Sequence, residues 1–153
     1  MRGGLTTRFR AWRRRRVART TRHTTPGLPD TSIDRVSVAY EPVRDGDPDP
    51  GEVVWAWVPY DEDHTTGKDR PVVVIGRSGD HLAGIQLTTK GHDHPDNVLV
   101  GAGDWDPQRR DSWAKLDRIV QIDPATARRV DAVLDRARFD ALVAAARRAG
   151  HHV

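Results

Sequence analysis

The chain has 153 residues, enough for one domain, and contains no cysteine. This composition excludes disulfide bonds, cysteine-ligated zinc and cysteine nucleophiles, and it leads us to expect a reducing, cytoplasmic location. The net charge of +3 is unevenly spread, because nine of the 25 basic residues and none of the 22 acidic ones precede Asp30. A basic tail therefore precedes a body with 16 basic and 22 acidic residues, a net charge of −6.

The sequence predicts that the first part of the chain is a tail outside the folded domain. Residues 1–38 are rich in arginine and poor in apolar residues, so we expect them to be disordered. Nothing here is typical of a signal peptide, and no run in the chain is apolar for long enough to span a membrane. Arg13 to Arg16 form either a solvated charge run or a nucleic-acid contact. Alternatively the start is misplaced, with Leu28, Val36 or Val38 as the true first residue; the mass of the native protein would test this.

Residues 39–50 are rich in Asp and Pro and predict an extended linker, so that the folded domain covers residues 51–150. Short apolar runs bounded by turn residues then predict strands. The run from Pro71 to Ile75 is continuous and β-branched, which is typical of a strand buried on both faces. The expected strands cover residues 52–58, 71–75, 81–89, 97–100 and 113–122.

The period changes near the C-terminus. Phe139, Leu142, Val143 and Ala146 recur at helical spacing, Asp135 precedes them as an N-cap, and Gly150 follows. Five short strands and one helix over an open face predict a mainly β protein, a strongly bent antiparallel sheet or a partly open barrel.

Three segments place cations, hydroxyls or carboxylates at strand ends. Gly67 to Pro71 contains Arg70, whose planar guanidinium could bind a phosphate; the alternative is a surface ion pair with Asp69 or Asp61.

Leu87 to Gly91 brings Thr88, Thr89 and Lys90 together, and these can hold phosphate oxygens, although threonine is also common in strands.

In Trp113 to Arg118, Lys115 and Asp117 are two apart in the expected strand, so both point to one face, opposite Ala114 and Leu116. They could divide acid and base roles or form an ordinary salt bridge.

Other chemistry has little support. His92, Asp93, His94 and Asp96 share a polar loop but lack a further spaced ligand group, so we expect no metal and no cofactor. Neither Ser78 nor Ser112 lies in a nucleophile-elbow pattern, and no glycine-rich nucleotide loop is present.

Taken in order, these segments resemble the PemK/MazF family of bacterial toxin ribonucleases. The resemblance covers about residues 51–150 and rests on Gly51-Glu-Val-Val-Trp55, Gly67-Lys-Asp-Arg-Pro-Val-Val-Val-Ile-Gly-Arg77, Thr88-Thr89 and Trp113-Ala-Lys-Leu-Asp-Arg-Ile-Val-Gln-Ile-Asp123. It implies an SH3-like barrel shared with the CcdB gyrase poisons, a homodimer, and a cognate antitoxin peptide that blocks the site. It also implies metal-independent cleavage of single-stranded RNA to 2′,3′-cyclic phosphate and 5′-hydroxyl ends.

The resemblance also implies roles for single residues. Arg70 matches the arginine that stabilises the scissile phosphate, and Thr88 matches the threonine that holds it. Lys115 and Asp117 match an acid–base pair in which the cation is more often arginine. The chain departs from the family at Thr65, where many members carry an acidic residue, and at Arg118, where glutamine is common. We add as substrate-binding residues Lys68, Thr89, Lys90, Trp105 and Arg118.

Four tryptophans could stack on unpaired bases. Trp55 and Trp57 lie in an apolar strand and fit a core or a dimer interface better. Trp105, in the polar loop Gly103 to Pro107, is the preferred stacking candidate over Trp113.

Two other functions stay open. One is a catalytically silent RNA- or peptide-binding module, suggested by Thr65 and by the acidic body. The weaker one is a gyrase poison; that family depends on a Trp-Gly-Ile end, whereas this sequence ends Gly150-His-His-Val153.

Overall fold

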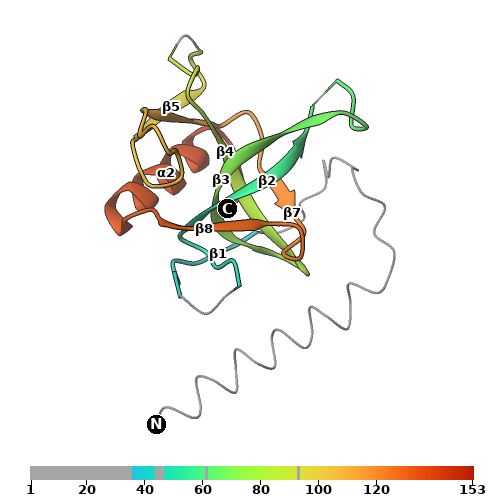
Figure 1. The fold of residues 1–153 in the computed structure, drawn as a ribbon. Coiled ribbons are helices and arrows are strands. Elements are labelled where there is room, and N and C mark those ends of the chain that lie inside the picture. Colours follow the sequence, from blue (N-terminus) through green and yellow to red (C-terminus); the bar gives the residue numbers. More distant parts are fainter. Residues whose placement is uncertain (1–35, 44–46, 61, 93) are drawn as a thin grey trace.

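The computed structural model describes residues 36–43, 47–60, 62–92 and 94–153. The tail expected over residues 1–38 therefore lies outside the described residues, apart from its last three. Within the described part, eight antiparallel strands form one sheet that does not close, and one helix follows (Figure 1). The predicted mainly β class with a C-terminal helix is confirmed, as an open sheet.

The elements follow the chain in a simple order. The strands are β1 (Ser37–Val38), β2 (Glu52–Pro59), β3 (Gly67–Ser78), β4 (His81–Thr88), β5 (Asn97–Gly101), β6 (Ser112–Lys115), β7 (Val120–Ile122) and β8 (Arg128–Val133), and the helix is α2 (Arg136–Arg148). The sheet has the order β5-β6-β4-β3-β2-β8, with β1 beside β3 and β7 beside β4. Shifts of register at Val53/Val54, Val74/Gly76 and Leu99/Gly101 bend the strands, as bulges do.

Strand β3 is buried on both faces, as its β-branched run predicts. Val73 and Ile75 belong to a core cluster shared with the helix residues Phe139 and Leu142. Val72 and Val74 belong to a second cluster on the other face, and all four valine and isoleucine side chains of β3 are fully buried. The second cluster is completed by side chains of three other strands: Val54, Ala56, Val58, Leu82, Val120 and Ile122.

The helix forms where its periodicity predicts it. The carboxylate of Asp135 accepts a hydrogen bond from the backbone N–H of Arg138 at 2.9 Å, which is an N-cap. Phe139, Leu142 and Val143 are buried against the first cluster, so the predicted covering of one sheet face is confirmed. Past the last turn, Gly150 adopts the left-handed conformation (φ +99°) that glycine allows. No helix in the described part of the chain is both long and apolar enough to cross a membrane.

The strand expected over residues 113–122 is in fact two strands. β6 pairs with β4 at Leu87 and Thr88, whereas β7 pairs with the other end of β4, from Leu82 to Gly84. The chain must therefore leave the sheet between Lys115 and Val120 to reach the second position. A turn at residues 116–117 makes this change, and hydrophobic alternation alone does not reveal it. The remaining additional strands, β1 and β8, were not predicted.

The predicted linker also differs from the structure. Val36 is buried in the first core cluster, and Ser37 and Val38 pair with Arg77 and Gly76 of β3. The hydroxyl of Tyr40 donates a hydrogen bond to the carbonyl of Leu134 at 2.8 Å. The described part of residues 36–50 is therefore packed onto the domain, and the fold begins before residue 51.

A charge network anchors the end of that segment. Asp49 is fully buried and Glu52 is 2% exposed, positions that carboxylates rarely occupy unpaired. Arg77 reaches Asp49 at 3.3 Å, and Arg129 of β8 donates two hydrogen bonds to the Glu52 carboxylate. Because removing one partner would leave a buried charge, these pairs fix the end of the segment to β3 and join β2 to β8.

The packing of the segment can be tested with Tyr40→Phe, which removes the hydroxyl and keeps the ring that contacts Phe139. Loss of the bond to Leu134 should lower the free energy of unfolding by about 1 kcal/mol in urea denaturation. Tyr60→Phe, at an exposed tyrosine, is the matched control and should change it little. If the two substitutions lower the free energy of unfolding equally, the hydrogen bond between Tyr40 and Leu134 is contradicted.

Candidate functional site

The candidate site is built on one face of the central strands β3 and β4. The β2–β3 ladder is regular from Val53 to Pro59, so Arg70 lies on the same face as Val72, opposite Ala56. Gln86 of β4 pairs with Val72, and Thr88 follows two residues later on that face. The same register, continued by two residues, sets Thr88 beside Arg70.

Strands β6 and β5 extend this face. Trp113 pairs with Thr88, and Lys115 follows two residues later. Lys115 in turn pairs with Asn97 of β5. We call the residues Arg70, Gln86, Thr88, Trp113 and Lys115 the polar face. Three of the predicted site residues, Arg70, Thr88 and Lys115, are thus brought to one surface.

The hydroxyl of Thr88 is oriented by one hydrogen bond and keeps its own hydrogen free to donate. Its oxygen accepts a hydrogen bond from the backbone N–H of Lys90 at 3.2 Å. A hydroxyl has one hydrogen to donate, and this bond leaves it unused. Thr88 can therefore donate to an acceptor such as a phosphate oxygen lying over the face.

The cations at this face have no carboxylate partners among the described residues. Asp69, one of the two acids that could have paired with Arg70, instead contacts Arg128 at 2.8 Å, and Asp61 lies outside the described residues. In the described part of the chain, no ion pair involves any of the four cations Lys68, Arg70, Lys90 and Lys115. Lys68 is exposed and lies two residues before Arg70, on the same face. These positive charges are thus available to a polyanion.

Asp117 does not share the strand alternation that its spacing predicted. β6 ends at Lys115, and Asp117 lies exposed in the following turn, so the expectation that both residues point to one strand face is wrong. The backbone N–H of Leu116 bonds the carbonyl of Asp96 as the chain leaves the sheet. Asp117 remains near Lys115 in the chain, outside the face itself.

Arg118 was expected to line a groove for substrate. Its guanidinium donates to the carbonyl of Pro59, at the end of β2, and its Nε is buried. The side chain therefore ties the β6–β7 turn to the β2 end. This contact supports the turn that carries Asp117.

The loop between β2 and β3 contains an acid, Asp63, two residues before Thr65. The Thr65 hydroxyl donates a hydrogen bond to the Asp63 carboxylate at 2.6 Å, and the Thr65 backbone N–H donates to the same carboxylate at 3.0 Å. These hydrogen bonds lower the pKa of Asp63 below its ordinary value. Asp63 is therefore a weak proton acceptor and fits the general-base role poorly.

Trp105 is not a stacking surface. The ring is 1% exposed, its indole N–H donates to the Ser112 hydroxyl at 2.9 Å, and the guanidinium of Arg138 lies 5.7 Å from the ring centroid. A Cβ at Gly103 would come within 2.1 Å of the ring, so the polar loop closes over it. The prediction for Trp105 is wrong because the loop turns this side chain into the core.

The accessible indoles lie elsewhere. Trp57 is 47% exposed, but its position on β2 alternates with Ala56 and so puts it on the opposite face from Arg70. Trp113 is partly buried and pairs with Thr88 on the polar face. The backbone of Gly91 packs against the Trp113 side chain. Trp113 is thus the aromatic residue that the fold places beside the candidate phosphate site.

The histidine loop shows no metal centre among its described residues. Asp93 lies outside the described part, and among the described residues no three histidines or carboxylates converge. His94 Nδ1 instead accepts a hydrogen bond from the backbone N–H of Asp96 at 3.2 Å. That bond shapes the loop that precedes β5.

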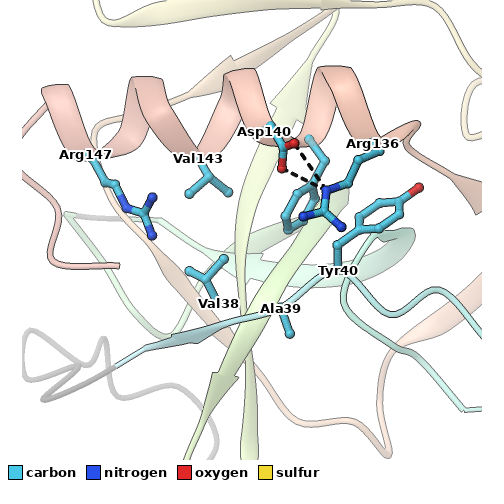
Figure 2. A pocket seen from close by; sticks show the side chains of 8 residues that line it. Val38, Ala39, Tyr40, Arg136, Asp140, Val143 and Arg147 are labelled. Atoms are coloured by element: carbon cyan, nitrogen blue, oxygen red, sulfur yellow. Dashed lines mark hydrogen bonds and ion pairs between the residues drawn. The ribbon is translucent and has the colours of Figure 1, made fainter.

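A cavity of about 300 Å³ lies apart from the polar face. Figure 2 shows it between the helix α2 and the segment formed by the end of β1 and the residues after it, and its lining includes Val38, Tyr40, Phe139 and Val143. Arg136 is held there by the carboxylate of Asp140 at 3.1 Å. None of the predicted site residues lines this cavity.

The comparison with protein families agrees with this arrangement. Residues 49–149 match the model of the PemK-like, MazF-like toxins of type II toxin–antitoxin systems. The match covers most of the chain, and the chain therefore belongs to this family of toxins. A comparison with curated proteins finds no match.

The burial of Trp105 predicts a stability effect. Trp105→Phe removes the bond to Ser112 and leaves a void in the core, so the free energy of unfolding should fall by about 1–3 kcal/mol. Trp57→Phe, at the exposed indole, should lower it by less than about 1 kcal/mol. Urea denaturation followed by far-ultraviolet circular dichroism measures both. A larger loss of unfolding free energy for Trp57→Phe than for Trp105→Phe would contradict the placement of Trp105 in the core.

Proposed function

We propose that this toxin is a metal-independent endoribonuclease that cleaves single-stranded RNA to 2′,3′-cyclic phosphate and 5′-hydroxyl ends. The observation that carries the proposal is the placement of Arg70 and Thr88 on adjacent strands, on one face, without competing ion pairs among the described residues. Family membership supports it.

The chemistry needs little from the protein, because RNA carries its own nucleophile, the 2′-hydroxyl. Arg70 stabilises the charge that develops on the phosphate oxygens, and the Thr88 hydroxyl donates to the same phosphate. Lys115 and Asp117 serve as the acid–base pair in this proposal, Lys115 on the face and Asp117 from the turn. Lys68, Thr89 and Lys90 contact the flanking phosphates, and Trp113 replaces Trp105 as the stacking residue.

The proposed partners follow from the family. A cognate antitoxin peptide would cover the polar face and block RNA. A homodimer would present two such faces. Val130 and Val133 on the edge strand β8 are exposed apolar residues that a second copy could cover. The proposed place of action is the cytoplasm, where messenger RNA is found.

Arg70→Ala tests the central assignment. Purified protein should cleave single-stranded RNA in the presence of EDTA, and the substitution should lower kcat by about 10²–10³-fold, because one preorganised charge donor to the phosphate is lost. Arg148→Ala, at an exposed position of α2, is the control and should cleave normally. Asp117→Asn, assayed alongside, should lower kcat if Asp117 is the base.

Two results would contradict the proposal. Undiminished cleavage by Arg70→Ala would show that the site is elsewhere. RNA that binds the unaltered protein but stays intact over long incubation would favour a silent binding module instead.

The hydroxyl of Thr88 can be tested separately. Thr88→Val keeps the shape but loses the donor, and kcat should fall by about 10–100-fold, whereas Thr88→Ser should retain most activity. Steady-state kinetics on a short RNA measure both. Equal activity of the valine and serine variants would show that the hydroxyl makes no contact in the transition state.

A further inference from the structure

A buried glutamine lies within the polar face and has no role in the reaction described above. Gln86 of β4 pairs with Val72 of the neighbouring strand β3. It therefore lies diagonally beside Arg70 and two residues before Thr88. On its other side, the β4–β6 register continued by one residue brings Lys115 alongside it. Gln86 is therefore surrounded by the side chains proposed to bind the scissile phosphate.

The side chain of Gln86 is largely buried and has no hydrogen-bond partner among the described residues. The residue is only 4% exposed. Among the described residues, no hydrogen bond reaches its side chain, and its amide atoms are not among the unpartnered polar atoms that are sealed from solvent. Water can therefore still reach this amide, and a ligand on the polar face could take the place of that water. The arrangement leaves one donor–acceptor group open toward the polar face.

The chemistry of an amide differs from that of its neighbours. Arg70, Lys115 and Thr88 supply donors, which suit the acceptor oxygens of a phosphate. A carboxamide carries a donor and an acceptor side by side, and a nucleobase edge presents the same pair in reverse. Unpaired bases of single-stranded RNA expose these edges to proteins.

We propose that Gln86 is a specificity-determining residue that hydrogen-bonds the edge of one base next to the cleaved phosphate. The proposal rests on the ribonuclease function proposed above and adds the group that is recognised. Val72, a member of the second core cluster, pairs with Gln86 and lies beside it on the same face of the sheet. In this proposal Arg70 and Thr88 position the phosphate, and the Gln86 amide forms hydrogen bonds with the adjacent base.

The test compares an RNA oligonucleotide carrying one preferred cleavage site with two versions that lack a base on either side of the cut. For the unaltered protein, loss of one of these bases should lower kcat/KM by about 10-fold, the order expected for a bidentate base contact. Gln86→Met, which keeps length and apolar packing, should lose the same factor on the intact RNA. It should lose nothing further on the RNA without that base.

Gln121→Met makes the same chemical change on β7, outside the polar face, and should behave like the unaltered protein. Gln86→Asn, which withdraws the amide by one methylene, gives a second variant with the same expected loss, and thermal unfolding checks that each variant is folded. If Gln86→Met keeps the full base preference, the inference is overturned while the ribonuclease function stands. If the unaltered protein cleaves no RNA, both are overturned.

Discussion

The two-sided burial of β3 is the constraint on which the rest of the molecule depends. Val72 to Ile75 alternate between two apolar clusters on opposite faces of the sheet. A shift of β3 by one residue would move each of these side chains into the other cluster. This fixed alternation continues outward to Arg70, which leaves the apolar region on the side of Val72. The position of the candidate catalytic arginine is therefore set by the packing of the valines that follow it.

Alternation also explains which features could be predicted from the sequence. The β-branched run of β3 and the 3.6-residue period of α2 each carry their own burial pattern, so both elements were predicted. The strand positions of Arg70 and Thr88 could also be predicted, because Arg70 directly precedes the β-branched run and Thr88 lies near the end of the strand expected over residues 81–89. The turn after Lys115 carries no such pattern, since it depends on β6 and β7 pairing with different ends of β4.

Long-range contacts account for the other differences. Trp105 lies in a loop whose composition is polar, and only the distant Ser112 and Arg138 show that the ring is drawn into the core. Tyr40 and Asp49 lie among prolines and acids, and their partners Leu134 and Arg77 are far away in the chain. Gln86 showed no signal because a single glutamine in a strand is ordinary; its significance comes from its lack of a partner.

The location of the polar face on β3 and β4 bears on how such a toxin could be controlled. Central strands with fully buried side chains open only when the whole domain unfolds, whereas loops and edges open locally at little cost. A site on a hinged loop could be silenced by a shift of that loop. A site on the most protected strands keeps its geometry for as long as the protein is folded, so silencing it requires a molecule that covers the surface or a protease that removes the chain.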